Sequence, residues 1–335
     1  MNFDIAMPLT LFAVTIIAIF LDKKVEGRMK GVFEEKEFRV RDAVLLVAAI
    51  SVAVSLIVFI PQMAIMTIFL FSYSMLLFIF TYIFSDFQKT KARLFCIAFL
   101  VASFTAATVS LFGLAANNLI VYGALAFFCL FAFTFIASLY EEHRTSAQER
   151  WYLAILPPAL FIFLYLFFSG TPIWFPYLLD IYGIIFAVLI ILYLGSLFTW
   201  KTTLFFVAFL TTMDIVLVLV TGAMVSAASH VSGLQLPMLI TVRTIPPVTI
   251  DGNLIWMSLG LGDFFFAGLI ALQTLRKYGR SFAILSTVAM SASFFIFESF
   301  LLTYQLRAFP GTVMIICGWL PLILWKKLAR QKKTS

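Results

Sequence analysis

The chain has 335 residues, of which 63% are hydrophobic and 12% are charged. That balance excludes a soluble globular protein, which could not cover its surface with polar groups, and it indicates an all-α polytopic membrane protein. The net charge of +7 does not indicate a nucleic-acid partner, because the basic residues lie in short connections and at the C-terminus. The spacing of the cysteines and histidines predicts no metal site.

Eleven apolar segments follow one another along the chain, and each is close to the length that spans a hydrocarbon core of ~30 Å. They lie at about 5–21, 43–60, 62–85, 93–115, 118–139, 152–169, 176–200, 202–228, 253–275, 281–306 and 309–328. In the first segment no basic residue precedes the apolar run, and the basic cluster follows it. This order favours a retained first helix over a cleaved signal peptide.

Basic residues alternate between the connections. The odd-numbered connections and the C-terminus carry them, whereas the even-numbered connections carry almost none beyond Arg243 and Arg307. Because positive residues mark the cytoplasmic side, the alternation predicts a topology with the N-terminus outside and the C-terminus inside. The basic C-terminus is expected to lie against the lipid bilayer.

Two aspartates interrupt consecutive apolar segments. Asp214 lies within 205–220, and Asp263 lies within 254–272. A charged side chain at mid-bilayer costs roughly 3 kcal/mol on insertion scales, so we expect such residues to serve a function. Helix rise places Asp214 ~18 Å from the cytoplasmic start of its helix and Asp263 ~15 Å from the outer start of the next helix. In antiparallel neighbours these depths nearly coincide, and the two carboxyl groups can face each other.

Two close carboxyl groups in a low-dielectric site share one proton, which is the arrangement that aspartic proteases use. The charged member acts as general base on a water, while the protonated member donates to the scissile carbonyl oxygen. Gly260 and Gly262 leave room beside Asp263 for another backbone, such as that of a substrate. A proton-coupled transporter that uses the same aspartates stays open as an alternative, although the chain shows no transporter-like internal repeat.

Three local motifs carry a family resemblance. The stretch 213–225 has an aspartate followed by a glycine-containing turn and Met-Val, and Gly260-Leu261-Gly262-Asp263 reads Gly-x-Gly-Asp. Pro310-Gly311-Thr312 opens the last apolar segment. Over about 201–328 the chain resembles the signal peptide peptidase and presenilin family of intramembrane aspartyl proteases, in the form of a prokaryotic, archaeal-like member. That family has Tyr-Asp where Met213-Asp214 stands and Pro-Ala-Leu where Pro310-Gly311-Thr312 stands.

The resemblance implies a presenilin-like helical bundle. Since the family has nine spans, we expect 9 to 11 transmembrane helices. Residues 1–200 would form the scaffold and the substrate entry, and residues 201–335 would carry catalysis. The resemblance assigns catalysis to Asp214 and Asp263 without metal or cofactor. It assigns the active-site motifs to Gly260, Leu261, Gly262, Pro310, Gly311 and Thr312.

The expected activity is endopeptidase cleavage of transmembrane helical proteins within the bilayer. The predicted orientation is that of signal peptide peptidases, which implies type II substrates and signal-peptide remnants. We expect a multi-pass location in the plasma membrane. The altered Pro310-Gly311-Thr312 motif leaves open a family member that binds transmembrane segments without cutting them.

Two further acids and one outer segment need an interpretation. Glu298 is expected to make a structural hydrogen bond or to lie near the outer interface, and Asp180 is expected to be interfacial. The run Leu236–Val242 favours a β-strand, which could pair with an unwound substrate or form an ordinary hydrophobic loop.

Overall fold

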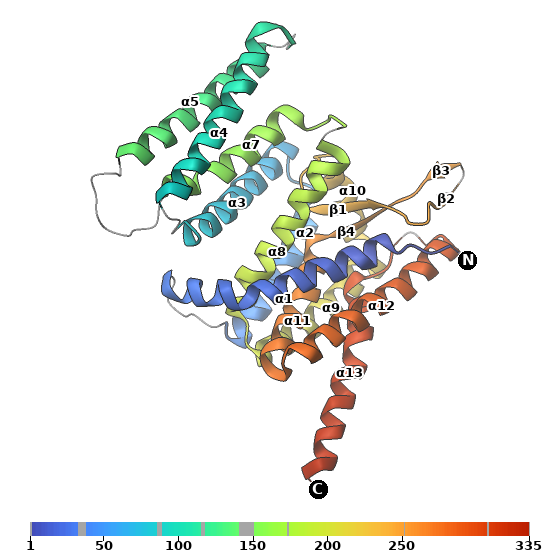
Figure 1. The fold of residues 1–335 in the computed structure, drawn as a ribbon. Helices are drawn as coiled ribbons and strands as arrows, with labels where there is room; N and C mark the ends of the chain where they lie inside the picture. Colours follow the sequence, from blue (N-terminus) through green and yellow to red (C-terminus); the bar gives the residue numbers. More distant parts are fainter. Residues whose placement is uncertain are drawn as a thin grey trace. The chain divides into compact units, whose positions relative to one another are not determined.

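The computed structural model describes residues 2–32, 38–85, 89–114, 118–140, 151–172, 174–250, 252–306 and 308–334. These residues are predominantly helical (Figure 1). Ten of the helices in the described part of the chain are long and apolar enough to cross a membrane. The chain is therefore a multi-pass, almost entirely α-helical membrane protein, to which two short β-hairpins are added.

The helices are α1 (Ala6–Val32), α2 (Val40–Ile57), α3 (Gln62–Ile83), α4 (Lys89–Val109), α5 (Asn118–Tyr140), α6 (Trp151–Ala154), α7 (Leu156–Phe168), α8 (Leu179–Leu197), α9 (Trp200–Ile215), α10 (Ala223–Ser232), α11 (Leu261–Tyr278), α12 (Arg280–Tyr304) and α13 (Gly311–Thr334). Short π-helical segments are η1 (Ser110–Leu114), η3 (Trp174–Leu178) and η4 (Val216–Val220). The strands are β1 (Leu239–Arg243), β2 (Thr249–Ile250), β3 (Asn253–Leu254) and β4 (Trp256–Gly260).

The chain forms two compact units. One combines Met1–Ile65 with Pro176–Ser335, and the other is Met66–Phe175. Every predicted site residue belongs to the first unit, which also contains α1 and α2. The functional division at residue 200 stays a prediction, but α1, α2 and α8 share a compact unit with the helices that carry the aspartates.

An aromatic core holds the Met66–Phe175 unit together. Cys96 of α4, Phe131 of α5 and Tyr152 of α6 are buried in one cluster. Phe127 of α5 stacks on Phe163 of α7, with the ring centroids 4.3 Å apart. The surfaces of these helices are as apolar as the lipid tails, so burial of apolar surface alone does not favour contact between helices. Aromatic pairs of this kind stabilise the contact between helices.

Helix α11 lies at the centre of the first unit. It packs against α1, α8, α9, α12 and α13, and its side chains from Phe264 to Thr274 are all buried. Glycines allow α8 to approach closely, since a Cβ on Gly268 would lie 2.5 Å from Ile191 and one on Gly195 would lie 3.0 Å from Leu272. Small residues at membrane-helix interfaces permit this kind of packing.

The structure corrects the predicted span 253–275. Helix α11 begins at Leu261, and the residues before it form β3 and β4. Gly260 precedes the helix with extended backbone angles (φ −70°, ψ 147°). An unbroken apolar run does not distinguish a buried strand from a helix, so the sequence pattern predicted a single helix over both elements.

The predicted span 202–228 is also divided. Helix α9 passes into the π-helical turn η4, and the chain then turns at Gly222, which has a φ of +67°. Glycine adopts this left-handed conformation without steric cost, and α10 starts immediately after it. Because the residues on both sides of Gly222 are apolar, the hydropathy pattern does not show where the helix ends.

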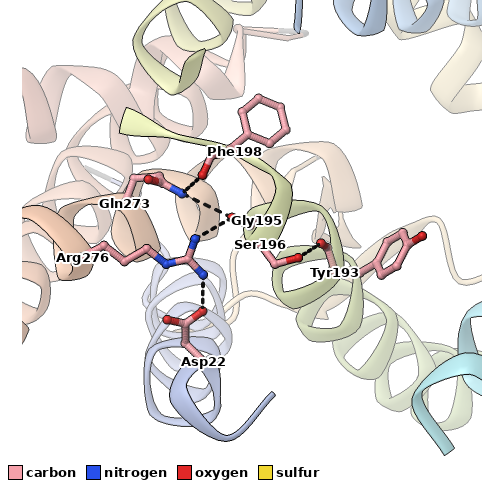
Figure 2. A network of polar contacts seen from close by, with 7 residues as sticks. All are labelled: Asp22, Tyr193, Gly195, Ser196, Phe198, Gln273 and Arg276. Atoms are coloured by element: carbon pink, nitrogen blue, oxygen red, sulfur yellow. Dashed lines mark hydrogen bonds and ion pairs between the residues drawn. The ribbon is translucent and has the colours of Figure 1, made fainter. Parts of the chain in front are cut away.

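Polar contacts fix the C-terminal end of α11 (Figure 2). Arg276 donates to Asp22 Oδ1 of α1 at 2.9 Å and to the Gly195 carbonyl of α8 at 3.2 Å. Gln273 Nε2 donates to the carbonyl oxygens of Phe198 at 2.6 Å and of Gly195 at 3.3 Å. The last carbonyl groups of a helix lack intrahelical hydrogen-bond partners. These donors supply partners for the carbonyl groups at the end of α8 and hold that end against α11.

Candidate active site

Asp214 and Asp263 line one cavity of about 610 Å³. Asp214 lies in the last turn of α9, directly before η4, and Asp263 lies in the first turn of α11, directly after β4. The two carboxyl groups are close enough for a direct Coulomb interaction. The structure thus brings together the two aspartates that the sequence singled out, and it places each of them beside a change in backbone conformation.

The first turn of α13 contacts Asp214. The Thr312 side chain donates a hydrogen bond from Oγ1 to Asp214 Oδ2 at 2.6 Å, and the Thr312 backbone N–H donates to the same oxygen at 3.3 Å. The positive end of the α13 helix dipole also faces these carboxyl groups, which favours negative charge there. Both lone pairs of Oδ2 are used, so Oδ1 is the Asp214 oxygen that stays available for another partner.

The preceding residue contacts Asp263. A Cβ atom on Gly311 would lie 2.5 Å from Asp263 Oδ1, so the backbone of α13 touches this carboxyl group. Pro310 is buried, and its carbonyl accepts a hydrogen bond from Met314 N at 3.3 Å. The Pro310-Gly311-Thr312 segment therefore lies across both aspartates.

The residues of the Gly260-Leu261-Gly262 motif have different surroundings. Gly260 lines the cavity and lies beside Asp263, where a Cβ would be 3.5 Å from Oδ2. Leu261 is buried, and its backbone N–H donates to the Met238 carbonyl at 3.1 Å, so it joins α11 to the start of β1. A Cβ on Gly262 would meet no atom within 4 Å among the described residues, so this glycine faces open space.

The cavity wall is mostly apolar. It is formed by side chains of α9, η4, α10, α12 and α13 together with strand β4. The described residues that line the cavity include Asp214, Asp263 and Glu298 but no lysine, arginine or histidine. An apolar chamber with a pair of acids at one point suits an apolar ligand that undergoes acid–base chemistry at that point.

Of the two sequence-based expectations for Glu298, the structural hydrogen bond is contradicted, and the position near the outer interface stays a prediction. Glu298 is 0% exposed, and neither carboxyl oxygen has a hydrogen-bond partner among the described residues. The expected structural hydrogen bond is therefore wrong for this part of the chain. Instead, Glu298 belongs to the wall of the cavity that holds the two aspartates.

Asp180 has a structural contact that the sequence did not indicate. Its Oδ1 accepts a hydrogen bond from the Thr241 backbone N–H at 2.8 Å, which fixes β1 against the first turn of α8. The predicted strand in Leu236–Val242 is confirmed as β1. The strand that leads to Asp263 is β4, which the apolar pattern of the sequence did not indicate.

Comparison with models of protein families, with curated proteins and with solved structures gave no match for this chain. Among the described residues no three histidine, cysteine, aspartate or glutamate side chains gather in a way that could hold a metal ion. Interpretation of the cavity therefore depends on its own residues.

Proposed function

We propose that the protein is an intramembrane aspartyl endopeptidase of the signal peptide peptidase and presenilin type. The observation that carries the proposal is that Asp214 and Asp263, from consecutive apolar segments, meet in one cavity beneath the Pro310-Gly311-Thr312 turn. A presenilin-like bundle with the N-terminus outside and the C-terminus inside belongs to the same proposal. It agrees with the alternation of basic residues.

The aspartates divide the work of peptide hydrolysis. One carboxylate takes a proton from a water that attacks the scissile carbonyl carbon, and the other carboxyl group donates a proton to the carbonyl oxygen. When the tetrahedral intermediate collapses, a proton passes to the leaving nitrogen and the C–N bond breaks. Thr312 holds Asp214 Oδ2, so Asp214 Oδ1 and the Asp263 carboxyl group face the reacting atoms.

A substrate helix has to be unwound before its peptide bond can be attacked, because the helix shields that bond. We assign to β4 the strand edge with which an unwound substrate segment pairs. Thr241 of β1 faces Ser258 of β4, and the Thr241 N–H points away to Asp180. In an antiparallel ladder this makes Thr241 and Ser258 a non-hydrogen-bonded pair, so the backbone polar groups of Ser258 point away from β1. Among the described residues no strand pairs with that edge.

The edge of β4 that contains Ser258 leads directly to Asp263. Met257, Ser258, Leu259 and Gly260 all line the catalytic cavity, and Asp263 follows within the next turn. An extended substrate segment paired with β4 would present its backbone to the aspartates. The substrates in this proposal are transmembrane segments of type II proteins and signal-peptide remnants, cleaved in the plasma membrane.

The test is cleavage by the purified chain in liposomes that contain a fluorescently labelled transmembrane peptide. We expect the wild type to cut the peptide and both isosteric variants, Asp214→Asn and Asp263→Asn, to lose at least about a thousandfold in rate, as removal of one member of a catalytic unit does. Asp180→Asn is the control, because its carboxyl group lies outside the cavity. Equal cleavage by the wild type and the Asp263→Asn variant contradicts the proposal.

The same liposomes separate the other functions. If the wild type binds the peptide without cutting it, the chain is a transmembrane-segment receptor. If it cuts nothing and transports protons across the membrane, and this transport requires Asp214 and Asp263, it is a transporter.

A further inference from the structure

Glu298 is the one carboxyl group of the cavity that the proposed hydrolysis leaves unused. It lies on α12, fully buried, and neither of its oxygens has a hydrogen-bond partner in the described part of the chain. A buried polar group without a partner destabilises a fold, and such groups are rare. A glutamate kept in this position therefore points to a partner that joins it from the cavity.

The charges around Glu298 define that partner. The described lining residues carry three acids and no basic side chain. Asp4 lies within electrostatic range of Glu298 and is itself buried. The Asp4 carboxylate accepts hydrogen bonds from the backbone N–H groups of Ala6 (2.9 Å), Met7 (3.2 Å) and Ile245 (2.7 Å). Those bonds fix its negative potential beside Glu298, and a negative potential in a low-dielectric wall attracts a cationic N–H donor.

Contacts between α12 and α13 show how far Glu298 lies from the aspartates along the helix axes. Ser293 Oγ of α12 donates to the Met314 carbonyl of α13 at 2.7 Å, so these two residues lie at one level. Glu298 is about 7.5 Å along α12 from Ser293, and the aspartate-contacting residues Gly311 and Thr312 are about 4 Å along α13 from Met314 in the same direction.

Glu298 therefore lies about 4 Å beyond the aspartates, toward the outer ends of these helices. An extended substrate advances about 3.3 Å per residue. The first three residues beyond the cleaved bond, on the outer side, are thus the ones that pass Glu298.

We propose that Glu298 is a specificity-determining residue that receives a lysine side chain of the substrate, located within three residues of the cleaved bond on its outer side. The inference rests on the proposed protease function. Glu298 reaches the ligand by a rotation of its own side chain from the wall into the cavity, with the lysine ammonium as the missing hydrogen-bond donor. The site thereby selects transmembrane segments that carry one buried cation.

The test compares leucine-rich transmembrane peptides that are identical except at one position. A lysine is placed at each of the first five positions on the outer side of the cleaved bond, and the matched peptide has norleucine there. For the wild type in liposomes, we expect kcat/KM to be at least about tenfold higher for lysine at one of the first three positions, as a charge-assisted hydrogen bond provides. In the Glu298→Gln variant this ratio should fall toward one.

Ser299→Ala is the matched control. Ser299 is the neighbouring buried residue on α12, and its hydroxyl donates to the Phe295 carbonyl of its own helix at 2.8 Å. The control should keep the tenfold preference for lysine. A wild-type ratio near one at all five positions, or an unchanged ratio in Glu298→Gln, overturns the inference.

A binding measurement keeps the result independent of catalysis. Fluorescence anisotropy of the same peptides with the Asp263→Asn protein should show the same tenfold preference in Kd, and Glu298→Gln in that background should abolish it. If no peptide is cut by the wild type but the binding preference is present, the protease function fails and the lysine site stands. Glu298→Met provides a second variant, because a carboxyl group that makes no hydrogen bond is expected to be replaceable without loss of folding.

Discussion

Gly311 is the residue at which the backbone of α13 touches the Asp263 carboxyl group. A Cβ at this position would lie 2.5 Å from Asp263 Oδ1 and 2.7 Å from Asp263 Cγ. Real Cβ atoms do not approach so closely, so a side chain of any size displaces Asp263 or α13.

We expect Gly311→Ala to lower kcat for transmembrane peptides by at least about tenfold, because a displacement near 1 Å at a reacting group is sufficient for such a loss. Gly27→Ala in α1 is the control, because a Cβ there would meet no atom within 4 Å among the described residues. Steady-state cleavage in liposomes measures both variants. Similar rates for the Gly311→Ala variant and the wild type would refute the tight contact.

At the scale of elements, β4 is the strand that directly precedes α11 and Asp263. One of its edges is paired with β1 from Leu239↔Gly260 to Arg243↔Trp256. The hairpin β2–β3 extends the same arm away from the helices of its unit (Figure 1). The second edge of β4, which includes Ser258, is the one that an extended substrate can use.

Proline at position 258 tests this edge. Ser258→Pro removes one backbone donor that points away from β1, so the β1–β4 ladder keeps its own hydrogen bonds. We expect kcat/KM to fall at least tenfold, about the effect of one or two lost backbone hydrogen bonds. Ser258→Ala is the control, since it removes only the Ser258 Oγ contact to Thr241 Oγ1 at 2.8 Å. If both variants cleave equally well, substrate pairing with β4 is wrong.

At the scale of the whole molecule, α1 is tied to α11, which carries Asp263, by a partly buried ion pair. Asp22 and Arg276 are 254 residues apart in sequence, and their side chains meet at 2.9 Å (Figure 2). The Asp22 side chain is 4% exposed, so it depends on this partner. Helix α1 is thus part of the compact unit that contains Asp214 and Asp263.

We expect Arg276→Met to destabilise the folded protein by about 2–4 kcal/mol, because removal of one partner leaves a buried charge unpaired. Thermal unfolding in detergent measures the loss. The double variant Asp22→Asn/Arg276→Met should recover a large part of it, since the unpaired charge is then absent. Additive losses in the double-variant cycle would show that the two side chains do not depend on each other.

The sequence predicted the membrane class and the approximate positions of the long helices, because hydropathy over a span length is a strong signal. It also predicted the meeting of Asp214 and Asp263 from helix rise and chain direction. It did not predict β4 or the turn at Gly222, because both lie inside apolar runs. The Thr312 contact with Asp214 joins residues 98 positions apart, and only the packing of α13 could reveal it.

Helix α11 is the most shielded helix of its unit and also one of the least suited to lipid. It is absent from the ten apolar spans found in the described residues, and it carries Asp263, Gln273, Arg276 and Lys277. A helix of this composition gains little from entering the bilayer alone. We therefore expect α11 to become stable in the bilayer only when the helices around it, including α12 and α13, have packed against it. In the proposed protease, the pair of aspartates is then complete only after α13 has packed against α9 and α11.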